Sequence, residues 1–145
     1  MNDEAKTCWN GKTTRSDKSW GHEVVWATLR GVSGKILFME KGKSTSLKYY
    51  KHKNEVILIR KGRVRIAWAD ENYHSEKYPS RIQISLLKEG DVFCIQSTCP
   101  YRITALEDSE VFEIGNATSN TDRVVIYEEK EIKEFTDNNF EKEEV

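Results

Sequence analysis

The stretch Gly42–Gly62, GKSTSLKYYKHKNEVILIRKG, decides the fold and carries the candidate site. Its first half is polar, and Lys48, Tyr50 and His52 are spaced by two residues, so a strand would point all three to one face. Glu55 follows directly before an apolar run. One face is therefore expected to carry an amine, a phenol and an imidazole close to a carboxylate.

Short strand-like segments continue on both sides of this stretch, separated by clusters of turn-forming residues. Residues 63–69 alternate most regularly, with Val64, Ile66 and Trp68 on one side. The other segments are 22–29, 35–40, 81–87, 92–95, 101–106, 110–114 and 123–127. Because no helix is indicated before residue 128, the pattern predicts an all-β antiparallel sandwich or barrel.

The two ends of the chain differ from this body. Residues 1–18 are polar, with Trp9 as their one aromatic side chain, and are predicted to form a flexible arm. Residues 128–145 hold eight acids against three lysines, which predicts an acidic tail that is either a short helix or disordered. Residues 19–127 are expected to form a single domain.

The composition limits the classes of partner. The chain has 145 residues and a formal net charge of −1, so its overall charge indicates neither a nucleic-acid nor a membrane partner. Its three cysteines lack the spacing of a disulfide framework or a zinc site. The N-terminal residues lack the apolar core of a signal peptide, and no run reaches the roughly 18 apolar residues of a membrane helix. We therefore expect a soluble, cytoplasmic protein.

The spacing of Gly42, Glu55 and Gly62 resembles the first motif of the cupins, which are small jelly-roll barrels. In that family the motif runs from a glycine through His-x-His and a glutamate to a second glycine. A second motif begins at Gly90–Ile95, GDVFCI, and then departs from the family's pattern. The resemblance covers about residues 18–127 and implies an all-β, single-domain cupin jelly-roll β-barrel.

Within the cupins, the chain looks most like the module of mannose-6-phosphate isomerase and mannose-1-phosphate guanylyltransferase proteins. The matching residues are Trp20, Gly21, Glu23, Lys35, Ser46, Leu47, His52 and Glu55. This likeness implies a pocket for a sugar phosphate or a nucleotide sugar, and an activity of the sugar-phosphate isomerase type. Because cupins commonly pair their barrels through a sheet edge, it also implies a homodimer.

The metal-ligand positions of the family are altered in this chain. Cupins that bind a metal use two first-motif side chains, the glutamate and a second-motif histidine, and these positions here hold Lys48, Tyr50, Glu55 and Tyr101. An ammonium repels a dication, and a phenol with a pKa of about 10 stays neutral without a metal. The resemblance therefore implies no metal and no other cofactor, the alternative being an unusual ferric site of His52, Glu55 and tyrosinate.

The altered pocket leaves two hypotheses for the function. If the chain is an enzyme, Lys48 would polarise a sugar carbonyl, and Glu55 or His52 would act as the base. In the second hypothesis the protein is a metal-free, non-catalytic cupin that binds a ligand or another protein. Lys48 would then form a structural ion pair with Glu55. A small anionic or sugar-like molecule is the expected ligand.

Five side chains are candidates for ligand binding. An amine and two phenols would contact the ligand inside the barrel, and two arginines on one side of residues 63–69 would add positive charge. The alternatives are that the phenols only fill the former metal site and that the arginines form ion pairs across a dimer interface. The candidates are Lys48, Tyr50, Tyr101, Arg63 and Arg65.

Overall fold

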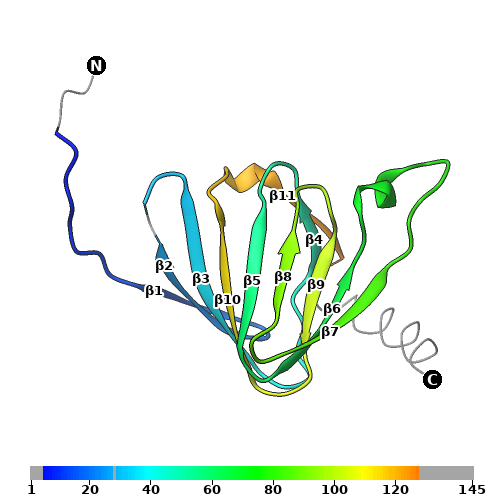
Figure 1. Ribbon diagram of the computed structural model, residues 1–145, viewed down its shortest axis with the longest axis horizontal. Helices are drawn as coiled ribbons and strands as arrows, with labels where there is room; N and C mark the ends of the chain where they lie inside the picture. Colours follow the sequence, from blue (N-terminus) through cyan, green and yellow to red (C-terminus); the bar gives the residue numbers. More distant parts are fainter. Residues whose placement is uncertain (1–4, 28, 128–145) are drawn as a thin grey trace.

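In the computed structural model, which describes residues 5–27 and 29–127, two antiparallel sheets face each other (Figure 1). The six-stranded sheet contains, in spatial order, β1 (Thr14–Lys18), β2 (Gly21–Ala27), β3 (Val32–Met39), β10 (Ser109–Asn116), β5 (Glu55–Lys61) and β8 (Val92–Ile95). The five-stranded sheet contains β11 (Arg123–Tyr127), β4 (Leu47–Tyr50), β9 (Tyr101–Ala105), β6 (Arg63–Trp68) and β7 (Gln83–Lys88). This arrangement is a jelly-roll sandwich, and it confirms the predicted all-β fold class.

The hydrophobic core lies between the two sheets, where alternate residues of the facing strands point inward. Ile57 and Ile59 of β5 are fully buried, as are Val64 and Ile66 of β6 and Val111 of β10. Burying one such side chain stabilises the fold by about 1.5–3 kcal/mol. The predicted alternation of residues 63–69 is therefore confirmed, and it holds the five-stranded sheet against its partner.

Gly62 lies where the chain passes from one sheet to the other. β5 ends at Lys61 in the six-stranded sheet and β6 begins at Arg63 in the five-stranded sheet, so these consecutive strands do not pair as a hairpin and Gly62 connects the two sheets. The φ angle of Gly62 is +86°, and a β-carbon there would lie 2.6 Å from the backbone oxygen of Asp108. Only glycine satisfies both requirements.

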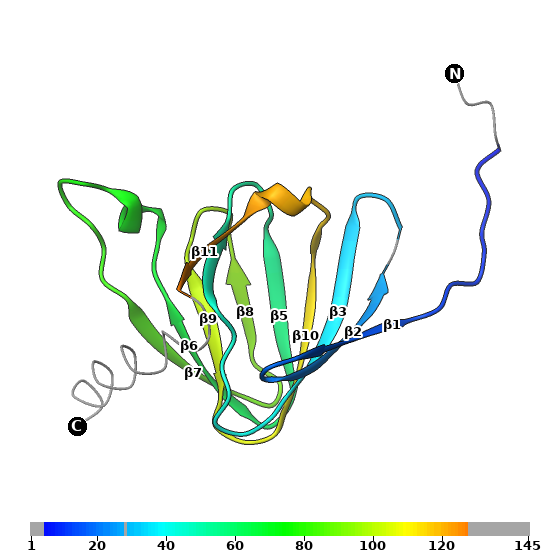
Figure 2. The ribbon, with the colours of Figure 1, turned by 180° about the vertical axis from the view of Figure 1, so that it is seen from behind.

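The N-terminal boundary of the domain differs from the predicted one. Residues 14–18, placed in a flexible arm from the sequence, form the edge strand β1, which pairs with β2 from Thr14 opposite Val25 to Lys18 opposite Gly21. Polar residues suit an exposed edge strand, and the buried Trp20 anchors the turn that follows it. Residues 5–13 run away from both sheets in Figure 1 and Figure 2. The predicted acidic tail, 128–145, lies outside the described residues.

The structure also bears on membrane association. Across residues 5–27 and 29–127, no helix is long and apolar enough to span a bilayer.

Candidate functional site

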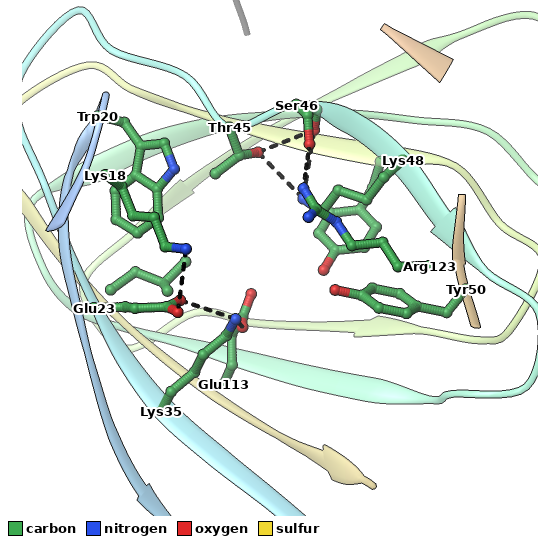
Figure 3. Close-up of a pocket in the computed structure, with 12 residues that line it drawn as sticks. Lys18, Trp20, Glu23, Lys35, Thr45, Ser46, Lys48, Tyr50, Glu113 and Arg123 are labelled. Atoms are coloured by element: carbon green, nitrogen blue, oxygen red, sulfur yellow. Dashed lines mark hydrogen bonds and ion pairs between the residues drawn. The ribbon is translucent and has the colours of Figure 1, made fainter. Parts of the chain in front are cut away.

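A polar cavity of about 310 Å³ lies between the two sheets, lined by side chains from β1, β2, β3 and β10 on one side and β4, β9 and β11 on the other. Figure 3 shows these side chains converging on one space. The charged members of the lining are Lys18, Lys35, Lys48, Arg123, Glu23 and Glu113. Four cations and two carboxylates therefore face the cavity, which leaves it with an excess of positive charge.

One wall of the cavity is an ion-pair network on the six-stranded sheet. The Nζ of Lys35 lies 3.0 Å from Glu23 and 3.6 Å from Glu113, and the Nζ of Lys18 lies 3.6 Å from Glu23. Burial opposes the charge on Lys35, but the Glu113 and Glu23 carboxylates outweigh it and raise the pKa of this lysine. The pKa of Glu23 is lowered in turn, because Lys35 and Lys18 outweigh the effect of its burial, so Lys35 and Glu23 stabilise each other's charged forms.

Lys48 projects from β4 into the cavity, and its surroundings differ from those of the other lysines. It is only 6% exposed. Its Nζ donates to Thr45 Oγ1 at 3.2 Å and to the carbonyl oxygen of Ser46 at 3.4 Å, and it lies 4.0 Å from the ring centre of Tyr101. Within the described residues, Lys48 forms no ion pair with a carboxylate. Burial lowers its pKa to about 8, although the Glu113 and Glu55 carboxylates oppose the change.

Glu55 is buried behind the cavity, where a different lysine neutralises it. Its Oε1 accepts a 2.5 Å hydrogen bond from the hydroxyl of Tyr101, and its Oε2 lies 3.4 Å from the Nζ of Lys53. The alternative of a structural Lys48–Glu55 ion pair is therefore wrong, because Lys53 is the partner. Glu55 does not line the cavity and is linked to it by the hydrogen bond from Tyr101, which does. Glu113 lines the cavity directly.

The phenols at the positions that the resemblance assigns to metal ligands are held in their neutral form. Burial, and next to it the Glu55 carboxylate, raises the pKa of Tyr50 to about 12. Burial and then the Glu113 and Glu55 carboxylates raise the pKa of Tyr101 well above its usual value. A metal would have to displace both phenolic protons and meet the Lys48 ammonium, so this set does not fit a metal.

Among the described residues, no group of three or more histidine, cysteine, aspartate or glutamate side chains is placed to hold a metal ion. The predicted alternative of a ferric site at His52, Glu55 and tyrosinate depends on bringing His52 to the cavity, and His52 lies elsewhere.

His52 points to solvent, outside the cavity. Its side chain is 81% exposed, and its Nδ1 lies 2.7 Å from Oδ1 of Asp122. Asp122 also accepts from the backbone N–H groups of His52 and Lys53, so it fixes the connection between β4 and β5. The alternation through residues 48, 50 and 52 fails because β4 ends at Tyr50 and the chain then turns. The placement of His52 as a catalytic base is corrected accordingly.

The two arginines predicted to bind the ligand lie outside the cavity. Arg63 and Arg65 alternate with the core residues Val64 and Ile66 on β6, so they point away from the interior. Arg63 is exposed, and its Nε lies 2.6 Å from a carboxylate oxygen of Glu107. Their assignment as ligand-binding residues is therefore corrected.

The sequence patterns did not single out three charged residues that line the cavity, and one of them, Lys18, was placed in the predicted arm. Glu113 shares the inward side of β10 with the core residue Val111, and a charged side chain at such a position was a detectable signal. Arg123 opens β11, and its Nη2 donates to Ser46 Oγ at 2.9 Å. Only the pairing of β11 with β4 brings Arg123 to the cavity, so no local pattern could have revealed it.

The two facing sheets and the pocket between them define this chain as a cupin-fold protein. Oxalate decarboxylase from Bacillus subtilis superposes with a TM-score of 0.68 at 19% identity, over 85% of this chain and 34% of that one. KdgF from Halomonas sp. gives 0.61 at 13% identity, over 74% and 91% of the two chains. CapF, a capsular polysaccharide assembling protein from Staphylococcus aureus, gives 0.64 at 15% identity, over 81% and 35%.

These likenesses establish the fold alone. No protein-family model matches the sequence, and no curated protein does. The chain spans about a third, 34%, of the oxalate decarboxylase chain. The predicted cupin fold is confirmed, whereas the mannose-6-phosphate isomerase branch stays a prediction. Mn(II) centres are named for the Bacillus subtilis oxalate decarboxylase, while the described residues of this chain offer no comparable donor group.

Proposed function

We propose that the cavity binds a small organic anion, best represented by a monosaccharide phosphate, without a metal. The observation that carries this proposal is the Lys48 ammonium, which is buried, faces the cavity and forms no ion pair with a described carboxylate. A buried charge without a counterion costs several kcal/mol. The anionic group of a ligand between Lys48 and Arg123 would supply that counterion.

The size and the remaining lining of the cavity support a sugar phosphate of one ring. A volume of about 310 Å³ is at the lower end of the range for ligand pockets, so it suits a monosaccharide phosphate better than a nucleotide sugar. Thr45, Ser46 and Tyr50 offer hydroxyl groups, and Trp20 offers an apolar surface. Such a mixture matches the alternating hydroxyl and C–H surfaces of a sugar ring.

A thermal-unfolding panel on chelator-treated protein tests this proposal. Mannose 6-phosphate and mannose 1-phosphate are expected to raise the melting temperature, and uncharged mannose is not. A ligand at about 100 times its Kd stabilises the native state by about 2.7 kcal/mol. The affinity should fall as the pH rises above about 8, because Lys48 then loses its proton in the free protein. No shift with any sugar phosphate, or a shift that needs added metal, would contradict the proposal.

A second candidate function is sugar-phosphate isomerisation at the same site. Lys48 and Glu113 line one cavity, and burial lowers the pKa of the lysine while burial and Glu55 raise the pKa of the glutamate. An aldose–ketose isomerase needs a base to move a proton between adjacent carbons and an electrophile to polarise the carbonyl. Glu113 would be the base and Lys48 the electrophile.

Conversion of mannose 6-phosphate to fructose 6-phosphate by metal-free protein would test this second candidate. Glu113→Gln is expected to lower the turnover by about 100-fold or more, as removal of a general base does. Glu110→Gln is the matched control, since Glu110 is on the same strand but pairs with Arg60 away from the cavity. If the native protein binds the sugar phosphate without converting it, the isomerase hypothesis is wrong and the non-catalytic binding function is supported.

A further inference from the structure

A second cavity, of about 460 Å³, adjoins the cavity described above and shares two lining residues with it, Tyr50 and Arg123. Its other walls come from the start of β3, the β4–β5 connection and the segment between β10 and β11. These parts of the chain meet at one end of the sandwich, the upper end in Figure 1. We call the two spaces the first and the second cavity. Because they share two walls, one ligand can contact both.

The second cavity is cationic, like the first. Lys53 and Arg123 line it, and among the described residues no carboxylate does. Ser33 and Ser119 add hydroxyl groups. The Oε2 of Glu55 lies 3.4 Å from the Nζ of Lys53, but Glu55 belongs to neither lining. One carboxylate contact uses only part of the N–H donors of an ammonium, so Lys53 keeps donors for an anionic group in the second cavity.

The residues at the junction separate two lysines and connect two subsites. Lys48 lines only the first cavity and Lys53 only the second, whereas Tyr50 lines both. The Nζ of Lys53 lies 4.9 Å from the centre of the Tyr50 ring. Arg123 reaches into the first cavity, where its Nη2 donates to Ser46 Oγ at 2.9 Å (Figure 3). A guanidinium presents several N–H donors in a planar fork, so this arginine can contact one anionic group in each cavity.

We propose that the complete ligand carries two anionic groups, one between Lys48 and Arg123 in the first cavity and one between Arg123 and Lys53 in the second. This inference rests on the proposed function, because it keeps the first anionic group where that function places it. A hexose bisphosphate has the required chemistry. Its ring, between the two phosphates, would lie beside the Tyr50 phenol at the junction of the cavities.

Calorimetric titration of the full, chelator-treated chain with three sugars tests this inference. The probes are mannose 1-phosphate, mannose 6-phosphate and mannose 1,6-bisphosphate. The native protein is expected to bind the bisphosphate about 10-fold more tightly than either monophosphate, because the second group gains charge-assisted hydrogen bonds to Lys53 and Arg123. This comparison uses the native protein and does not depend on the folding of a variant.

The double variant Lys53→Met/Glu55→Gln then assigns the preference to the second cavity. It removes one positive and one negative charge together, so no unpaired carboxylate stays buried. In this variant the ratio of the affinities for the bisphosphate and for mannose 6-phosphate is expected to fall to about one. Lys51→Met is the matched control, because Lys51 is exposed in the same connection and lines neither cavity. It should keep the native ratio.

Failure of this inference and failure of the proposed function give different results. If the native protein binds mannose 6-phosphate but binds the bisphosphate no more tightly, the second anionic subsite is wrong and the proposed function stands. A preference that persists unchanged in Lys53→Met/Glu55→Gln would also overturn the second subsite. Absence of binding of all three sugars by the native protein would overturn both.

Discussion

Lys48→Met is expected to weaken binding of the anionic ligand by about 100-fold while leaving the ligand-free fold at least as stable as the native one. Lys48 is a buried cation that faces the cavity, and its carboxylate neighbours pair with other lysines. Loss of a charged hydrogen bond to the ligand should weaken binding by about 100-fold, or about 3 kcal/mol. The variant therefore separates a ligand-binding lysine from a structural one.

The stability side of this prediction has a defined pH dependence. The folded state lowers the pKa of Lys48 from 10.5 to about 8, so below about pH 8 the buried ammonium destabilises the ligand-free fold by about 3 kcal/mol. Between about pH 8 and 10.5 the unfolded chain binds the additional proton, and the stability of the native protein should rise with pH. Lys48→Met removes the titrating group, so this rise should disappear.

Chemical denaturation of native protein, Lys48→Met and Lys43→Met at pH 7.5 and pH 10 measures this effect. Lys43 lies in an exposed turn, so its replacement should change neither the stability nor the affinity. A loss of several kcal/mol in Lys48→Met would assign Lys48 a structural role and contradict the expected result.

Lys53→Met is expected to do the opposite, by destabilising the protein by about 3–5 kcal/mol, the usual cost of leaving one member of a buried ion pair alone. The side chains of Lys53 and Glu55 are 10% and 1% exposed, and their charged atoms lie 3.4 Å apart. Without the ammonium, the Glu55 carboxylate keeps only the hydrogen bond from Tyr101 among its described contacts.

The double variant Lys53→Met/Glu55→Gln provides the test of this cause. A glutamine at position 55 carries no charge and can still accept from the hydroxyl of Tyr101, so most of the lost stability should return. Lys51→Met serves as the control, because Lys51 is exposed in the same connection. If Lys53→Met and Lys51→Met unfold at the same denaturant concentration, the prediction that loss of the Lys53–Glu55 ion pair destabilises the fold is wrong.

The fold could be predicted from the sequence because its signals are local and repeated. The alternation of residues 63–69 and the spacing of Gly42, Glu55 and Gly62 depend only on neighbours in the chain, and the structure follows them. Gly34 shows where a local rule fails. The predicted strand segment starts at Lys35, but β3 begins at Val32 and contains Gly34, where a β-carbon would lie 2.8 Å from the β-carbon of Ala27 and 3.1 Å from the Trp26 ring.

The site was predictable only where side chains stay on a continuous strand. Lys48 and Tyr50 lie on β4 and reach the cavity together, as their spacing indicates. His52 has the same parity, but the strand has ended, and a hydrogen bond to Asp122 holds it outside. Arg123 reaches the cavity through the pairing of β11 with β4, a contact between distant segments that no local spacing encodes.

Proton uptake on ligand binding tests the central claim most directly, that an anion meets the Lys48 ammonium in a metal-free cavity. Chelator-treated protein would be titrated calorimetrically with mannose 6-phosphate near pH 8.5, in two buffers of different ionisation enthalpy. Because the pKa of free Lys48 is about 8 and a bound anion raises it, we expect net uptake of a proton by the native protein, and in Lys48→Met binding that is about 100-fold weaker and takes up no proton at this position. Absence of binding in the native protein, or unchanged binding and proton uptake in Lys48→Met, would contradict the claim.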